Sequence, residues 1–215
     1  MKINVRKNVL SDNDQQALTN AQRLAGLGIS GVNILASPGA GKTTFIVRLL
    51  QALPGELNNA VVEGDVASSI DTDRIIALGF AATQINTGGG CHLDASMVAS
   101  ALDKLTLRGP GFLFIENIGN LICPADFRLG ESLRLVVASV PEGDDKPVKY
   151  PAIFRLADAV VLNKIDLLGH VEFTMDNFVA GVRAVNAAAP IFEVSARNGA
   201  GIDKVVEWLR EAGKR

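Results

Sequence analysis

The stretch Ala36-Ser37-Pro38-Gly39-Ala40-Gly41-Lys42-Thr43 decides the fold of this 215-residue chain. It follows an apolar run at 32–35 and opens a helix-like segment at 44–50, the order that a phosphate-binding loop requires. Glycines without a Cβ let the backbone curl and point successive N–H groups at phosphate oxygens. Lys42 would reach the β- and γ-phosphates, and the Thr43 hydroxyl would be a ligand of Mg²⁺. We therefore predict that a nucleotide is bound by Ser37, Pro38, Gly39, Ala40, Gly41, Lys42, Thr43 and Thr44.

Apolar runs and helical patterns alternate along the rest of the chain. Strand-like runs occur at about 32–36, 60–64, 81–86, 112–116, 133–140, 158–162 and 191–195. Helical patterns occur at about 43–52, 70–78, 94–105, 149–156, 173–188 and 202–212. This alternation predicts an α/β fold with a doubly wound, mostly parallel sheet flanked by helices. No linker or composition break divides the chain, so we expect one domain over residues 1–215.

Residues 1–30 precede the first strand, and we expect them to form an arm and a helix. The first ten residues are predicted to be a tail. The helix is predicted to begin at 11–14, where acidic residues suit the N-terminal end of the helix dipole, and to end near Gly28. Apolar residues at helical spacing within it predict that it packs on the outside of the domain.

The composition excludes several classes of function. Hydrophobic residues make up 48% of the chain and aromatic residues only 5%, which suits a buried parallel sheet. A net charge of −2 offers no broad basic field, so we expect no nucleic-acid partner. No apolar run approaches the roughly 18 residues of a membrane span, and the N-terminus lacks a signal-peptide core. Two cysteines are too few for a disulfide framework, and the cytoplasm is the expected location.

Asn163-Lys164-Ile165-Asp166 follows an apolar run and matches the N-K-x-D pattern of guanine-nucleotide-binding proteins. The Asp166 carboxylate would accept hydrogen bonds from guanine N1–H and from its N2 amine. Adenine offers no such donor pair, and the unpaired carboxylate would cost at least about 1–3 kcal/mol. Further along, Ser195, Ala196 and Arg197 resemble the Ser-Ala-Lys loop that backs the base in these proteins, with Arg in place of Lys. The sequence therefore predicts GTP and GDP as ligands.

The residues for hydrolysis are less sharply marked. Glu116 and Gly119 form an E-x-x-G in place of the usual D-x-x-G, where Glu116 would hold Mg²⁺ through a water and the Gly119 N–H would sense the γ-phosphate. Asp65, at the end of the second strand, is a candidate for holding Mg²⁺ or positioning water. The alternative is that these carboxylates are solvated strand ends. Because Asn120 stands where a glutamine would follow Gly119, we predict slow intrinsic hydrolysis.

A cysteine and a histidine are neighbours in the glycine-rich stretch at 88–95. A loop can point Cys91 and His92 at one ion, which neighbours on a regular strand could not do. Thiolate and imidazole suit Zn²⁺ or Ni²⁺ rather than Mg²⁺. Cys123 lies just past the E-x-x-G glycine, and three ligands would need water or a second subunit to complete the site. The spacing leaves open the alternative of two ordinary small apolar cysteines and a surface histidine.

Taken together, the motifs resemble the HypB family, the GTPases that assist nickel insertion into [NiFe]-hydrogenase. They are S-P-G-A-G-K-T at 37–43, E-G-D at 63–65, C-H-L-D-A at 91–95, E-N-x-G-N-L-x-C-P-A at 116–125 and S-V-x-E-G-D-D-K-P-x-K-Y-P at 139–151. The resemblance implies a P-loop G domain of the SIMIBI type. It also implies a GTP- and metal-dependent homodimer with Cys91, His92 and Cys123 as interface ligands. A HypA-like nickel metallochaperone and the hydrogenase large subunit are the implied partners, and residues 142–149 would form a loop near the nucleotide or the second subunit.

The chain departs from some members of that family, since residues 1–30 contain no cysteine or histidine and so offer no N-terminal nickel store. His170 is expected to be a surface residue.

Three other functions stay open: a urease-type nickel GTPase, for which Cys-Pro-His would be expected, a small-molecule kinase, and a GTP-gated metal-binding scaffold. Our working hypothesis is a switch in which GTP and Mg²⁺ order the segments at Asp65 and 116–123 and thereby change the metal site.

Overall fold

The computed structural model describes residues 5–65 and 69–213, and their strands form one seven-stranded parallel sheet. The strands are β1 (Ile29–Ala36), β2 (Ala60–Asp65), β3 (Ala81–Asn86), β4 (Gly111–Glu116), β5 (Leu133–Ser139), β6 (Ala159–Asn163) and β7 (Ile191–Glu193). Their order across the sheet is β3-β2-β4-β1-β5-β6-β7. All seven predicted strands are present, and the predicted α/β fold is confirmed.

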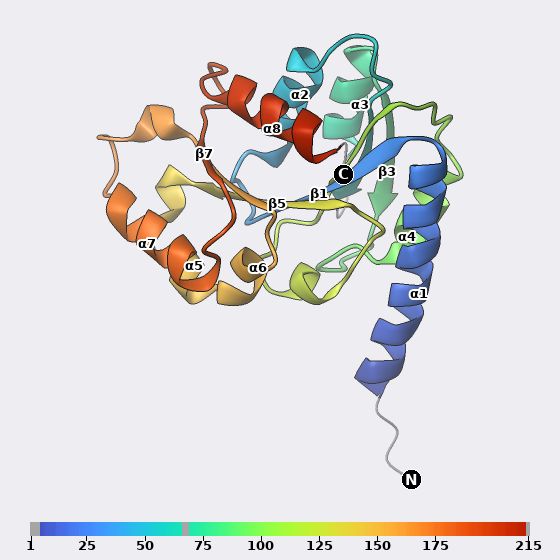
Figure 1. The fold of residues 1–215 in the computed structure, drawn as a ribbon, viewed down its shortest axis with the longest axis horizontal. Coiled ribbons are helices and arrows are strands. Elements are labelled where there is room, and N and C mark those ends of the chain that lie inside the picture. The colour runs from blue at the N-terminus through green and yellow to red at the C-terminus, as the bar shows by residue number, and fades with distance from the viewer. Residues whose placement is uncertain (1–4, 66–68, 214–215) are drawn as a thin grey trace.

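Helices cover both faces of this sheet (Figure 1). On one face lie α2 (Lys42–Ala52), α3 (Ile70–Ala77) and α8 (Ile202–Ala212), which pack on the apolar side chains of the central strands. The other face is covered by α1 (Val5–Gly26) and α4 (Ala95–Leu102) near β2 and β4, and by α5 (Lys146–Lys149), α6 (Pro151–Arg155) and α7 (Met175–Val185) near β5 and β6. Burial on both faces explains why the strands have continuous apolar sequences.

The N-terminal helix differs from the prediction. It begins at Val5, within the stretch predicted to be a tail, and residues 1–4 lie outside the described part of the chain. Its C-terminal half packs beside α4, whereas its first turns extend beyond the rest of the fold (Figure 1). The acidic residues at Asp12 and Asp14 are therefore internal to the helix and do not mark its start. As predicted, α1 lies on the outside of the sheet.

The order of the strands places the functional segments at one edge. Because the sheet is parallel, the carboxyl ends of β1, β2, β3, β4 and β6 meet there. The phosphate loop follows β1, the Cys91–His92 loop follows β3, the E-x-x-G segment follows β4, and the N-K-x-D segment follows β6. Ligands of open α/β sheets bind at this edge. In the described ranges, no helix combines the length and apolarity that crossing a membrane requires.

Candidate nucleotide and metal site

The phosphate loop is held open by two glycines in the left-handed region. Gly39 has φ 76° and Gly41 has φ 93°. A Cβ on Gly41 would also lie 2.7 Å from Asn163 Nδ2, so both the backbone angle and the neighbouring loop require glycine there. Gly41 precedes α2, whose first N–H groups have no partner in the helix and are free for phosphate oxygens.

A cavity of about 440 Å³ lies beside this loop, and carboxylates surround it. It is lined by Lys42 and Thr43 and by Glu63, Asp65, Asp71 and Glu116, with Gly119 at its rim. The Thr43 hydroxyl lies 2.9 Å from Glu116 Oε1 and 3.2 Å from Asp71 Oδ2. The structure thus brings together Lys42, Thr43, Asp65, Glu116 and Gly119, which the sequence placed on separate motifs.

Glu116 is the most perturbed of these groups. Burial raises its pKa to about 7, and the nearby Lys42 charge and the Thr43 hydroxyl limit the rise. Its Oε2 is buried and has no hydrogen-bond partner among the described residues. Burial likewise raises the pKa of Glu63, which accepts a hydrogen bond from the Thr72 hydroxyl. Ionising two buried carboxylates beside a phosphate loop is costly, so a positive charge in the cavity would stabilise them.

The donor atoms fit Mg²⁺. Every side chain that meets Thr43 offers oxygen, which hard divalent cations prefer. The unpartnered Glu116 Oε2 is a free acceptor in the same cavity. Four carboxylates and one lysine would repel a triphosphate unless a cation accompanied it. Thr43 and Glu116 would hold the cation, whose charge would offset that of the phosphates.

The base-binding loops are joined to the phosphate loop by Asn163. Its Nδ2 donates to the Ala40 carbonyl at 2.8 Å, and its Oδ1 accepts from the N–H groups of Lys164 at 2.8 Å and Ala196 at 3.0 Å. Asn163 is buried, and its amide joins the N-K-x-D segment to the phosphate loop and to the segment at Ala196.

Asp166 is held at the same edge by Ser195, whose Oγ donates to Asp166 Oδ1 at 2.5 Å. That contact leaves the second carboxylate oxygen available. Lys164 has φ 62°, unusual for a residue with a side chain, and its Nζ donates to the Gly39 carbonyl at 2.6 Å. The Lys164 side chain therefore connects the N-K-x-D segment to the phosphate loop.

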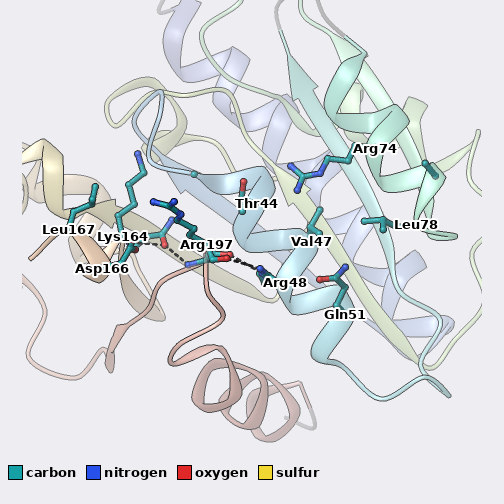
Figure 2. A pocket seen from close by; sticks show the side chains of 14 residues that line it. Thr44, Val47, Arg48, Gln51, Arg74, Leu78, Lys164, Asp166, Leu167 and Arg197 are labelled. Carbon is teal, nitrogen blue, oxygen red and sulfur yellow. Dashed lines mark hydrogen bonds between the residues drawn. The ribbon is translucent and has the colours of Figure 1, made fainter.

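A second cavity of about 720 Å³ extends from these loops along α2 to α3. Figure 2 shows Lys164, Asp166 and Arg197 on one side of it, Thr44 and Arg48 on α2, and Arg74 on α3. Arg48 binds the Ala196 carbonyl through Nε at 2.9 Å and the Arg197 carbonyl through a terminal nitrogen at 2.7 Å. Five of the predicted base-binding residues thus line one hollow together with Gly41: Asn163, Lys164, Asp166, Ala196 and Arg197. Ser195 is not among the lining residues and is fully buried.

Cys91, His92 and Cys123 come together on the other side of the phosphate cavity. One potential ligand atom from each lies within 4.8 Å of the other two. Cys91 Sγ is 3.5 Å from His92 Nδ1, and the His92 ring packs on Phe127 with ring centroids 4.0 Å apart. We refer to these three residues as the Cys–His cluster. This proximity argues against the alternative of unrelated residues.

The surroundings of the Cys–His cluster are open. Cys91 is exposed, and both cysteines are free thiols. Its hydrogen bond with Cys123 raises the pKa of the Cys91 thiol, as expected for two thiols that would share one negative charge. Burial lowers the pKa of His92, which favours the neutral imidazole that ligates metals. The cluster offers soft ligands, in contrast to the oxygens at Thr43.

Some residues of the site were not predicted from the sequence. Asp71 and Thr72 lie in the first turn of α3, and Asn117 and Asn120 connect the two halves of the site. An acidic residue at a helix start just after a strand end was the available signal for Asp71. His170 is exposed, as predicted.

The stretch predicted to form a loop at 142–149 is instead partly helical. Lys146–Lys149 is the one-turn helix α5, and its Pro147 contacts Gly181 of α7. Asp144 binds the start of α7, accepting from Thr174 N at 3.1 Å and Asn177 Nδ2 at 3.2 Å. The preceding turn, Val140–Glu142, lies near the 3₁₀ helix Ile165–Leu167 that follows the base-binding motif. This stretch therefore supports the base-binding loops from behind.

A strand, a glycine-rich loop and a helix with an N-K-x-D segment beside them define a P-loop nucleotide-binding protein, here with a Cys–His cluster beside its phosphate cavity. Residues 31–193 match the family model described as CobW/HypB/UreG, nucleotide-binding domain. The chain belongs to the HypB family within that group, which confirms the resemblance noted from the motifs.

Individual relatives support this assignment over nearly the whole chain. The hydrogenase maturation factor HypB of Rhizobium leguminosarum bv. viciae is 45% identical over 213 residues, 99% of this chain and 71% of that protein. The hydrogenase/urease maturation factor HypB of Helicobacter pylori (strain J99) is 38% identical over 213 residues, 97% of this chain and 87% of that protein. The crystal structure of Helicobacter pylori HypB in complex with nickel has a TM-score of 0.90 and 37% identity, with 94% of this chain and 95% of that one covered.

Proposed function

We propose that this protein is a GTP-hydrolysing metallochaperone that assists nickel insertion into [NiFe]-hydrogenase. The observation that carries the proposal is the position of Cys123. It lies on the segment that begins with Glu116 and Gly119 at the phosphate cavity and ends at the Cys–His cluster. The γ-phosphate would contact one end of this segment, and Cys123, a proposed ligand of the cargo metal, lies at the other end.

In this proposal the chain binds GTP with residues that are already in place. Gly39, Gly41 and the start of α2 direct N–H groups at the phosphates, and Lys42 supplies positive charge. Asp166 reads the guanine edge with the oxygen that Ser195 leaves free. Thr43 and Glu116 are proposed to hold Mg²⁺, Asp65 to hold Mg²⁺ or position water, and the Gly119 N–H to contact the γ-phosphate. Asn120 stands in place of the usual glutamine after Gly119, so intrinsic hydrolysis is expected to be slow.

The cluster is proposed to bind Ni²⁺, or Zn²⁺, in the GTP-bound state of a homodimer. Three ligands do not complete a four-coordinate site, and the exposed Cys91 is open to a second copy of the chain. A HypA-like metallochaperone and the hydrogenase large subunit are the proposed partners. The whole chain is proposed to act as one domain in the cytoplasm, where neighbouring thiols stay reduced.

Sedimentation of the purified protein tests this proposal. We would compare GDP with a non-hydrolysable GTP analogue, each with and without one equivalent of Ni²⁺ or Zn²⁺, and include Cys91→Ala as the control. A dimer that requires both nucleotide and metal and is lost in Cys91→Ala is the expected result. A monomer under every condition would contradict the interface site and leave only nucleotide binding.

A second candidate is a role in urease maturation. The Helicobacter pylori relative carries both activities in its name. The Cys-His-Leu sequence at 91–93 lacks the Cys-Pro-His expected of a dedicated urease-type GTPase, so hydrogenase is the preferred client. Restoration of hydrogenase but not urease activity in a strain that lacks its own maturation GTPase would distinguish the two.

A further inference from the structure

Two asparagines that follow β4 contact the backbone of the Cys91–His92 loop. Asn117 comes directly after Glu116 and is fully buried, and its Oδ1 accepts from the Leu93 N–H at 3.2 Å. Asn120 comes directly after Gly119, and its Nδ2 donates to the Cys91 carbonyl at 3.2 Å. The segment that follows β4 is therefore hydrogen-bonded to the loop that carries Cys91 and His92, two members of the Cys–His cluster.

Asn120 hydrogen-bonds to the backbone of both cysteine-bearing segments. While its Nδ2 binds the Cys91 carbonyl, its Oδ1 accepts from the Ile122 N–H at 2.8 Å and so shapes the turn that leads to Cys123. One side chain thus connects the Cys91 backbone to the turn that precedes Cys123. Such a side-chain contact to two backbone groups fixes geometry more firmly than a single hydrogen bond.

The end of this segment nearest the phosphate loop is tightly packed. A Cβ on Gly119 would lie 2.9 Å from Pro38 Cα in the phosphate loop. A Cβ on Gly64, which precedes Asp65, would lie 2.9 Å from the Leu93 side chain and 3.0 Å from the Glu116 carbonyl. A movement of residue 119 toward a γ-phosphate must therefore move Asn120 with it, because close-packed segments shift together.

The outer ends of the two cysteine-bearing segments are held separately, by α1. Asn13 accepts from the Ala95 N–H at 2.9 Å and donates to the Arg128 carbonyl at 2.9 Å. Asn20 donates to the Ala95 carbonyl at 2.8 Å and to the Leu129 carbonyl at 2.9 Å. These contacts fix both segments beyond the cluster and touch neither Glu116 nor Gly119. The Cys–His cluster lies between these contacts of α1 and the contacts of Asn120.

We propose that Asn120, supported by Asn117, is the positioning residue through which the bound nucleotide sets the spacing of Cys91, His92 and Cys123. The inference rests on the proposed GTP-dependent metal site and adds the contact that transmits the signal. With GTP bound, the shift of Gly119 moves Asn120 and changes the separation of Cys91 and Cys123. Metal that fixes this separation acts back on Gly119 through the same contact. The change in metal affinity caused by nucleotide therefore equals the change in nucleotide affinity caused by metal.

The test measures Ni²⁺ affinity in two nucleotide states. Full-length protein with Mg²⁺ and either GDP or a non-hydrolysable GTP analogue would be titrated with Ni²⁺ against a competing chelator, and the thiolate-to-nickel absorbance would report binding. Allosteric coupling of this kind is typically about 5- to 150-fold. Asn120→Ala removes both contacts. Asn120→Asp keeps the acceptor for the Ile122 N–H, replaces the donor to the Cys91 carbonyl with a carboxylate oxygen, and adds a negative charge that acts on Ni²⁺ in both nucleotide states. Asn13→Ala is the matched control, since it loosens the same two segments at their outer ends.

We expect the affinity ratio between the two states to fall toward one in both Asn120 variants. Asn13→Ala should weaken Ni²⁺ binding equally in both states and keep the ratio. Retention of the wild-type ratio in Asn120→Asp would overturn the inference and leave the proposed function standing. A ratio of one in the wild-type protein would overturn the proposed switch and this inference together. If Asn120→Ala does not fold, Asn120→Asp carries the test, because its side chain has the same shape.

Discussion

The base-binding loops and the Cys–His cluster lie at the same edge of the sheet, yet they are held in different ways. Asn163 and Ser195 are buried and hydrogen-bonded within the chain, so the base-binding loops are complete in one molecule. Cys91 is exposed, and Ile122 beside Cys123 is 67% exposed. A site closed within one chain binds its ligand alone, whereas an open site with three ligands needs another component.

Replacing Lys42 is expected to have the largest effect and to show that the two regions are separable. Lys42→Ala removes the positive charge that acts on Glu116 and that, in the proposed function, contacts the phosphates. Loss of one such electrostatic contact costs about 10²–10³ in rate, so GTP hydrolysis should fall by that factor in a phosphate-release assay. Ni²⁺ affinity without nucleotide should stay at the wild-type value. A parallel loss of nucleotide-free Ni²⁺ binding would break the distinction between the regions.

The raised pKa of Glu116 predicts that this buried side chain lowers the stability of the folded protein when the nucleotide site is empty. Its carboxyl has a pKa of about 7 in the folded protein against an ordinary value of 4.5. Between these values the folded state binds more protons than the unfolded state, so stability falls as pH rises from 4.5 to 7 and then levels. At 1.36 kcal/mol per pKa unit, the full loss is at most roughly 3 kcal/mol.

Chemical denaturation in EDTA checks this prediction through the difference between wild type and Glu116→Gln. Glutamine has nearly the same shape and does not titrate, so the contributions of other groups largely cancel in that difference. The stability of Glu116→Gln relative to wild type should increase by up to roughly 3 kcal/mol between pH 4.5 and 8. A difference that does not change with pH would show that Glu116 is not strained in the empty site.

Asp166→Asn is expected to change which base is accepted rather than to abolish binding. The carboxylate that pairs with the guanine N1–H and N2 amine becomes an amide, and a mismatched buried contact costs about 1–3 kcal/mol, or roughly 5- to 150-fold in affinity. The new N–H would pair with the C2 carbonyl of xanthine, so affinity for xanthosine triphosphate should rise. Competition against a fluorescent nucleotide measures both. An equal loss for all purine nucleotides would indicate a collapsed loop.

The two regions also differ in how far the sequence predicted them. Lys42, Thr43, Asn163 and Asp166 belong to motifs with fixed spacing, because each acts next to a strand end whose position follows from the α/β pattern. Asp71 belongs to no such pattern, and the E-N-x-G-N motif includes Asn117 and Asn120 without indicating what their side chains contact. Their contacts depend on how the segment after β4 lies against the Cys91–His92 loop, and that packing joins residues distant in sequence.

The N-terminal helix shows a second limit of sequence analysis. Residues 5–10 were predicted to be a tail, and the cap expected at 11–14 is inside α1. Asn13 and Asn20 were given no role from the sequence, yet both are buried and bind the backbone of segments more than 70 positions away. Tertiary hydrogen bonds of this kind override local capping preferences, since local signals carry no information about distant partners.

Arg48→Lys, with the smallest expected effect, tests whether the base-binding loops are completed by contacts within the chain. Arg48 braces the Ala196 and Arg197 carbonyls with two nitrogens. Lysine keeps the charge but cannot span both carbonyls, so Arg48→Lys should weaken GTP binding by about 1 kcal/mol, roughly fivefold, in calorimetric titration. Arg74→Lys is the matched control, because Arg74 faces the same cavity from α3 (Figure 2) and no bracing hydrogen bond to Ala196 or Arg197 would be lost. Equal weakening in both variants would mean that positive charge, rather than bracing of the loop, is what the cavity requires.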